Sequence, residues 1–243
     1  MAGSSHADGA GARRGVSPAE AIARRGRVHP DWFVYFVPVS DLPLTLPAGL
    51  ASTLLAALDQ ERKIDRALAT LGPVADRDVA VIGGGPAELE RLRATGARVS
   101  ELAPPRGGPW PIADGAVDTI VSAWSAFRGV TADDLAEADR VLRPEGRLLV
   151  IHDYGRDDVS RLRGDLPDYG LWSRRDGPFI RNGFRLRVLH CFWTFESAAE
   201  AARFLREAFG EAGSAVAREL RRPRLSYNVA IYHRTRGAAP ALG

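Results

Sequence analysis

Three consecutive residues that could exchange protons, His152, Asp153 and Tyr154, end a short apolar run of the sequence. A histidine beside an acidic substrate can act as a general base, and His152 is a candidate for that role. The alternative is a structural or pocket-lining histidine. Ligands of open α/β sheets bind at the carboxyl ends of strands. We therefore predict that His152, Asp153 and Tyr154 are catalytic residues near a bound ligand.

A run of glycines could bring the backbone close to that ligand. Gly83, Gly84 and Gly85 end a second apolar run and precede Pro86, where a helix is expected. Glycines after a strand allow close approach, and a helix N-terminus favours negative charge. The pattern predicts a binding loop. A nicotinamide site is a rival interpretation, but Glu88 stands where G-x-G-x-x-G requires its third glycine.

Strands and helices alternate around these residues. Apolar runs before turns indicate strands buried on both faces, helices are expected between them, and Thr131 is the expected N-cap of one helix. Such alternation favours a parallel sheet with right-handed crossovers. The expected strands are Asp78–Gly83, Ala97–Glu101, Val117–Ser122 and Arg147–His152, and a helix is expected at Pro86–Thr95.

The flanking regions complete the predicted domain. Leucines at i+4 spacing predict one helix over Ala48–Leu71, after an apolar arm at Asp31–Pro47. Later, a strand (Phe184–Trp193), a helix capped by Ser197 that runs to Phe209, and a strand (Leu225–His233) are compatible with an antiparallel pair at the sheet edge.

Three ordered segments carry a family resemblance. They are VAVIGGGPA (Val79–Ala87), PWPIADGAVDTIVSAW (Pro109–Trp124) and RVLRPEGRLLVIHDY (Arg140–Tyr154). Together they resemble class I S-adenosylmethionine (SAM)-dependent methyltransferases of the type 11 group. The resemblance implies SAM as cofactor, with the glycine loop facing its carboxypropyl and ribose parts. It also implies that Glu101 holds the ribose hydroxyls, with a surface glutamate as the alternative.

The resemblance places further residues near the transferred methyl group. Ser122 and Trp124 follow the fourth strand of the family pattern and are expected to bind the cofactor. His152, Asp153 and Tyr154 follow the fifth strand. Methyl transfer depends mainly on positioning, with a base only for acidic substrates.

The chain also departs from the family pattern. Val81 replaces an acid of the first strand, and only eight residues, Leu102–Pro109, separate Glu101 from Trp110. Five of these eight are Pro or Gly, which excludes a helix, and a parallel crossover needs a dozen residues or more. We therefore expect a Rossmann-like, mostly parallel α/β sheet with helices on both faces that lacks one edge helix–strand unit. The aromatic arm could replace the missing wall, or SAM binding could be lost.

Other side chains have plainer interpretations. Cys191, the single cysteine, is expected to be a buried thiol, and His190 a core histidine rather than a ligand. Asp157 and Asp158 could bind a cation or begin a helix. No metal site is predicted. Aromatic residues could bind a planar substrate or fill the core, and two arginine clusters could meet phosphate or be solvated. The aromatic residues are Trp172, Phe179, Phe184 and Trp193. The first arginine cluster is Arg24, Arg25 and Arg27, and the second is Arg218, Arg221, Arg222 and Arg224.

Composition fits one globular domain without a membrane span. Of the 243 residues, 45% are hydrophobic and 26% charged, and the net charge is +3. No apolar run approaches the roughly 18 residues of a membrane span, and no signal peptide is evident, so a cytoplasmic location is expected. We expect a disordered tail at 1–16, a single domain at 17–236 and a flexible tail at 237–243. The expected function is a SAM-dependent methyltransferase of a small molecule. The alternatives are a non-catalytic binding or assembly module and a nucleic-acid-binding protein, and a homo-oligomer is compatible with the sequence.

Overall fold

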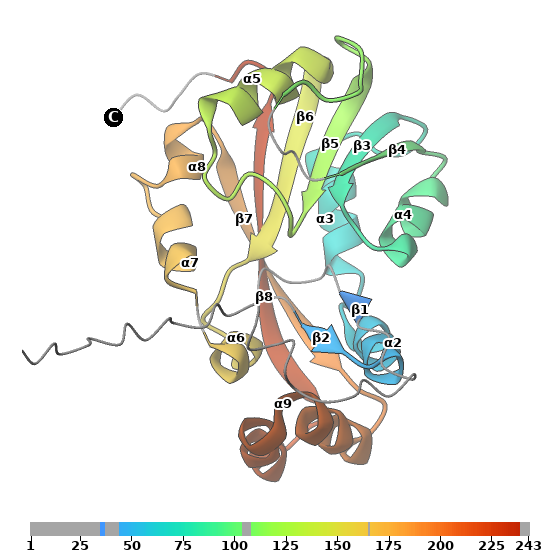
Figure 1. Cartoon of the computed structure of the whole chain (residues 1–243), viewed down its shortest axis with the longest axis vertical. Coiled ribbons are helices and arrows are strands. Elements are labelled where there is room, and N and C mark those ends of the chain that lie inside the picture. The colour runs from blue at the N-terminus through green and yellow to red at the C-terminus, as the bar shows by residue number, and fades with distance from the viewer. Residues whose placement is uncertain (1–34, 37–43, 104–107, 165, 239–243) are drawn as a thin grey trace, which may run out of the picture. The chain divides into compact units, whose positions relative to one another are not determined.

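The computed structural model describes residues 35–36, 44–103, 108–164 and 166–238 of the 243-residue chain (Figure 1). The chain divides into two compact units, 1–33 and 34–243, and the first lies outside the described residues. The tail expected at 1–16 and most of the arm expected at Asp31–Pro47 therefore lie outside them too. Of that arm, Tyr35–Phe36 (β1) pairs antiparallel with Thr45–Leu46 (β2).

A six-stranded mixed sheet forms the framework of the second unit, in the order β4-β3-β5-β6-β8-β7. The four strands from β4 to β6 are parallel, and β8 runs antiparallel to both β6 and β7. The strands are β3 (Asp78–Gly83), β4 (Arg98–Leu102), β5 (Val117–Ala123), β6 (Leu142–Asp153), β7 (Arg185–Thr194) and β8 (Arg224–Thr235). This confirms the predicted Rossmann-like class, including the antiparallel C-terminal pair. Among the described residues β4 is the edge strand, and no helix–strand unit lies beyond it, as was expected from the sequence.

Each face of the sheet has its own apolar core, because successive side chains of a strand point to opposite faces. Val79 and Val81 join one core cluster, whereas Ala80 and Ile82 join the other. All four are fully buried, as expected for a parallel sheet covered on both faces.

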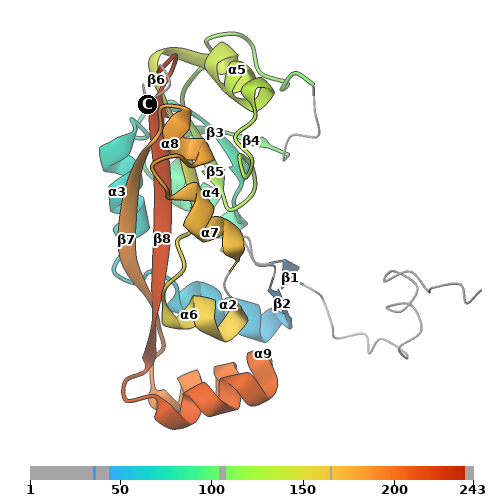
Figure 2. The ribbon, with the colours of Figure 1, turned by 90° about the vertical axis from the view of Figure 1, so that its left-hand side faces the viewer.

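Helices cover both faces (Figure 2). The first face carries α2 (Ala48–Ala57), α3 (Lys63–Leu71), α4 (Pro86–Arg93) and α9 (Ala198–Glu219), and α6 (Asp158–Arg163) contributes Val159 to the same core. The second face carries α5 (Ala132–Val141), α7 (Pro167–Trp172) and α8 (Pro178–Arg181). The sequence predicted neither α7 nor α8, and of α6 it offered only a possible start at Asp157 and Asp158.

The single helix predicted over Ala48–Leu71 is wrong: α2 and α3 are separate. Asp59 and Arg62 adopt left-handed φ values of 47° and 53° between them. The Asp59 carboxylate accepts the backbone N–H groups of Lys63 (2.9 Å) and Ile64 (2.7 Å). Asp59 thus binds donors that the first turn of α3 leaves unpaired, which favours a new helix over a continuous one.

Two other boundaries differ from the prediction. β6 begins at Leu142 rather than at Arg147, where a strand was expected, and residues 143–146 lie within it opposite an irregularity in the pairing with β5. Helix α9 continues past Phe209 to Glu219, but Gly210 has non-helical angles (φ 57°, ψ −128°) and divides it into two segments.

The predicted N-caps are confirmed. Thr131 Oγ1 accepts the N–H of Asp134 at 3.1 Å, and Ser197 Oγ accepts that of Glu200 at 3.1 Å. Within the described part of the chain, no helix combines the length and apolar character needed to cross a membrane.

Candidate functional site

The glycine loop lies where the connection order of the sheet reverses. From β3 the chain passes through α4 to β4 on one side, and then to β5 on the other side of β3. At the end of β3, Gly83 (φ 78°) and Gly84 (φ 65°) have left-handed angles that favour glycine. Gly85 is the N-cap of α4 without a side-chain cap bond, and Pro86 opens the helix. The three predicted glycines therefore form a turn into a helix N-terminus at the switch point.

Packing against the end of β5 also explains Gly83. A Cβ there would overlap the Ser125 hydroxyl and lie 2.7 Å from the Ala123 carbonyl oxygen. The Ser125 hydroxyl donates to the Ile82 carbonyl at 2.8 Å. The segment after β5 thus lies directly against the glycine turn.

The two cofactor-binding candidates at the end of β5 are both buried. Ser122 is fully buried, and its Oγ accepts the N–H of Ala126 at 3.1 Å. Trp124 is 5% exposed with a left-handed φ of 47°, and its backbone N–H donates to the Ile151 carbonyl at 3.0 Å. Its indole Nε1 donates to Asp153 Oδ1 at 2.9 Å. The structure brings Trp124 and Asp153 together by a direct hydrogen bond.

Asp153 lies at the centre of a buried hydrogen-bond network. Its carboxylate is 2% exposed and accepts four side-chain donors. Oδ1 accepts Trp124 Nε1 and the Tyr227 hydroxyl (2.5 Å). Oδ2 accepts the Tyr169 hydroxyl (3.0 Å) and Arg163 Nη1 (3.5 Å), and the Arg163 side chain is itself only 2% exposed. The network joins β6, α6, α7 and β8 to the end of β5.

His152 points away from this network, because neighbouring residues of a strand face opposite sides. It is fully buried, with its ring centroid 4.7 Å from that of Trp172 and 5.9 Å from that of Phe179. Tyr154 is half-buried, and the Arg156 guanidinium lies 5.6 Å from its ring centroid. The structure therefore does not bring the three predicted catalytic residues to one point.

Glu101 lies on the edge strand and is exposed. Its Cα partner is Val81, two residues before Gly83. The side chain is therefore accessible on the strand next to the glycine turn.

Glu88 is a buried acid behind the glycine turn that the sequence did not single out as functional. It is 8% exposed, and burial raises its pKa to about 7, with Asp65 adding to the rise and Arg91 opposing it. Its Oε2 would lie 3.5 Å from a Cβ placed on Gly84. An acid in the first turn of a helix is an ordinary pattern, so the sequence carries no signal of its burial.

Hydrogen bonds connect the segment after β6 to the start of β8. Asp157 caps α6 by accepting the N–H of Ser160 (2.7 Å), and it also accepts the N–H of Asn228 (2.8 Å). Asp158 accepts both the N–H (2.9 Å) and the hydroxyl (2.7 Å) of Ser226. The two aspartates thus form the helix N-terminal pair that was one of their two interpretations. Among the described residues, no group of three or more His, Cys, Asp or Glu could hold a metal ion.

Arginines of the RVLRPEG segment form contacts at the amino ends of the parallel strands, not at the carboxyl ends where a ligand would bind. Arg143 Nη1 bridges Asp78 (2.8 Å) and Asp118 (2.7 Å), at the amino ends of β3 and β5. Arg140 pairs with Glu137 and Asp114, both at 2.5 Å, and donates to two carbonyls of the loop before β5. This part of the resemblance therefore has a structural explanation.

Comparison with known proteins gives similarity at the level of structure alone. No protein-family model matches the chain, and no curated protein matches it either. A SAM-dependent methyltransferase from Aquifex aeolicus is 15% identical, with 76% of this chain and 97% of that chain covered and a TM-score of 0.41. The YcgJ protein of Bacillus is 14% identical (73% and 99% covered, TM-score 0.39). Geranyl diphosphate C-methyltransferase from Streptomyces coelicolor, solved with S-adenosyl-L-homocysteine, is also 14% identical (73% and 76% covered, TM-score 0.39). Similarities this remote do not indicate what this chain binds.

Proposed function

We propose that this chain is a SAM-dependent methyltransferase that acts on a small molecule. The observation that carries the proposal is the turn from Gly83 to Gly85, at the switch point between β3 and β5. Ligands of doubly wound sheets bind at such a point. The three sequence segments that resemble class I methyltransferases support SAM over other ligands.

The residues at this edge fit the cofactor. The backbone of Gly83–Gly85 and the N-terminus of α4 suit the carboxypropyl part, and the exposed Glu101 carboxylate suits the ribose hydroxyls. When bound, SAM supplies an electrophilic methyl group.

The chain's own residues supply positioning rather than proton transfer in this proposal. Both oxygens of Asp153 already accept hydrogen bonds, and His152 is fully buried against Trp172 and Phe179. Methyl transfer needs mainly an aligned acceptor. The proposal therefore favours substrates whose acceptor atom is nucleophilic without loss of a proton.

Calorimetry and thermal unfolding with SAM and S-adenosylhomocysteine test this proposal. Ligand at 100 times its Kd should stabilise the fold by about 2.7 kcal/mol. Glu101→Gln should weaken binding, whereas Glu90→Gln, an exposed change on α4, should leave it unaltered. The absence of any shift at millimolar ligand would refute the proposal.

A non-catalytic binding module is the second candidate, and two observations favour it. Ser125 lies against the glycine turn and the Trp124 indole is bonded to Asp153, so packing within the protein already accounts for these residues. Among the described residues, no strand lies beyond β4 to form the adenine side of a pocket. This candidate predicts cooperative unfolding that neither SAM nor its demethylated product changes, and ligand-induced stabilisation would exclude it.

A further inference from the structure

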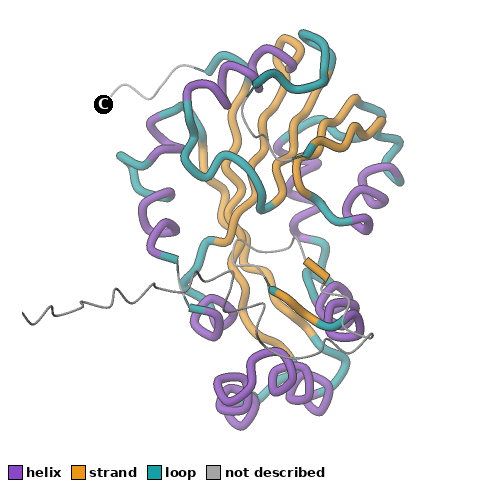
Figure 3. Tube along the Cα trace, in the orientation of Figure 1, coloured by secondary structure: helices purple, strands orange, loops and turns teal. Residues whose placement is uncertain are grey.

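A cavity of about 660 Å³ lies on the part of β8 that extends beyond β6. The pairing of β8 with β6 begins at Val229, opposite Asp153, whereas its pairing with β7 begins at Arg224. The two strands therefore continue past the end of β6 toward α6 and α9 (Figure 3). Residues of α6, β7, β8 and the second segment of α9 line the cavity.

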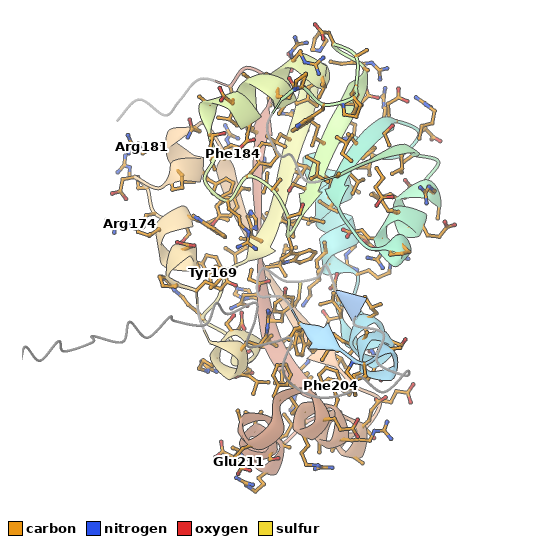
Figure 4. The ribbon with its side chains drawn as sticks, in the orientation of Figure 1. Tyr169, Arg174, Arg181, Phe184, Phe204 and Glu211 are labelled. Carbon is orange, nitrogen blue, oxygen red and sulfur yellow. The ribbon has the colours of Figure 1, made fainter. Side chains whose placement is uncertain are left out.

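The fold of α9 forms one wall. Gly210 ends the first segment, and a Cβ at Gly213 would overlap the carbonyl oxygen of Leu205 in that segment. This contact allows the two segments to pack closely. Phe204 lies on the side of α9 that faces the strands, whereas Glu211 lies on its outer side (Figure 4).

The lining combines apolar and basic surface. Its apolar part includes Leu162 of α6, Phe192 of β7, Val216 and Leu220 at the end of α9, and Leu225 of β8. The cavity therefore offers an apolar body contacts from four elements.

Its basic part consists of Arg161, Arg221, Arg222 and Arg224. The Arg224 guanidinium lies 4.3 Å from the centroid of the Phe192 ring, a cation–π distance. Basic and apolar groups are thus in contact at the cavity wall.

The two acids of the cavity neutralise only part of this positive charge, because Asp158 pairs with Arg161 and three arginines remain. The Asp158 carboxylate is already engaged by Ser226 and Arg161, and Glu219 is the other acid of the lining. Among the described residues, Arg221, Arg222 and Arg224 have no ion-pair partner. The cavity therefore carries a net positive charge.

Favourable interaction with the C-terminal dipole of α9 explains some of these arginines but not their arrangement. It accounts for Arg221 and for Arg218, which is outside the cavity. Arg161 of α6 is paired with Asp158, whereas Arg222 follows α9 and Arg224 belongs to β8, and both of these line the same cavity. The grouping of these arginines against an apolar wall is what one expects of an anion site.

We propose that this cavity binds an amphipathic phosphate monoester, with the phosphate among the arginines and the apolar chain against Phe192 and its aliphatic neighbours. Arginine is well suited to phosphate, because its planar donors bind two oxygens at once. The volume lies within the roughly 300–1,000 Å³ typical of small-molecule sites. The proposal is independent of SAM binding.

Titration calorimetry with octyl phosphate below its micelle concentration tests the proposal on the full chain. Saturable 1:1 binding is expected, with inorganic phosphate and neutral octanol each at least tenfold weaker. The double variant Arg221→Gln/Arg222→Gln should lose at least tenfold in affinity. The matched control Arg206→Gln/Arg218→Gln removes the same charge from α9 and its end, outside the cavity, and should bind like the wild type.

Several outcomes would overturn the proposal. Equal losses in the two double variants would indicate general electrostatic attraction, and equal affinity for inorganic phosphate would show that the apolar wall is unused. Sedimentation with phosphatidic acid vesicles distinguishes a free phosphate ester from the phosphate headgroup of a membrane lipid. Binding to vesicles without binding of monomeric octyl phosphate would assign the arginines to a lipid surface and exclude the cavity. Circular dichroism checks that each variant is folded.

Discussion

Replacement of Asp153 by asparagine tests whether this residue holds the fold or performs chemistry. Asparagine keeps the shape, but its amide nitrogen donates where one carboxylate oxygen accepted. In either orientation two donors lose their acceptor, either Trp124 and Tyr227 or Tyr169 and Arg163. We therefore expect Asp153→Asn to destabilise the protein.

The magnitude follows from the number of lost bonds. Hydrogen bonds to a charged group contribute about 1.5–3 kcal/mol each, so two of them amount to about 3–6 kcal/mol. A tyrosine hydroxyl can rotate to accept from the new amide, which recovers part of this loss. We expect a loss of about 3 kcal/mol, or roughly 6–12 °C in Tm for a domain of this size. Tyr227→Phe removes one donor and should cost about 1–2 kcal/mol.

Urea unfolding followed by circular dichroism measures these losses. Asp176→Asn is the control, because Asp176 is 70% exposed in a surface ion pair with Arg174 and such pairs contribute about 0–1 kcal/mol. If Asp153→Asn loses less than about 1 kcal/mol while any methyl transfer is abolished, the structural role is wrong. Asp153 would then be a catalytic residue, as the sequence predicted.

Two further predictions concern glutamate and glycine residues. Because burial raises the pKa of Glu88 to about 7, the unfolded state loses its proton at lower pH than the folded state. The free energy of unfolding should therefore fall by about 3 kcal/mol between pH 4.5 and 7. Urea unfolding at several pH values measures this fall. It should be absent in Glu88→Gln and present in the control Glu90→Gln, which changes an exposed residue. Gly213→Ala forces a Cβ against the Leu205 carbonyl. It should lower the free energy of unfolding by about 1–3 kcal/mol and weaken octyl phosphate binding. The control is Gly170→Ala, which has open space around its helical position and should stabilise the protein by up to about 1 kcal/mol in thermal unfolding.

The sequence predicted the sheet because buried strands carry a strong local signal. Asp78–Gly83 is predicted with the same bounds that the structure has, since a short apolar run before glycines is distinctive. The break between α2 and α3 was missed because apolar residues at helical spacing lie on both sides of it, and the irregular six-residue step from Leu58 to Ile64 was not taken as a boundary. Left-handed angles at Asp59 and Arg62 have no pattern of their own in a single sequence. Helices α6 to α8 are too short for helical periodicity to be evident.

The sequence predicted where the residues of the candidate site lie in the fold, but not which side chains surround them. Strand ends placed Trp124 and Asp153 near each other, and they are hydrogen-bonded. The other partners of Asp153 include Tyr169 and Tyr227, which are 16 and 74 residues further along the chain. No local spacing connects residues so distant in sequence, so the saturation of this carboxylate could be seen only in the folded chain.

The position of β8 between β6 and β7 sets an order for folding during synthesis. Among the described strands β8 is made after all the others, yet in their sheet it is the strand that links β7 to β6. Until Arg224–Thr235 has left the ribosome, the edge of β6 stays unpaired and β7 has no strand to join. Exposed strand edges and apolar surface are what chaperones bind on nascent chains. The protein should therefore depend on chaperones until β8 is inserted, and a ribosome stalled before residue 224 should present a protease-sensitive chain.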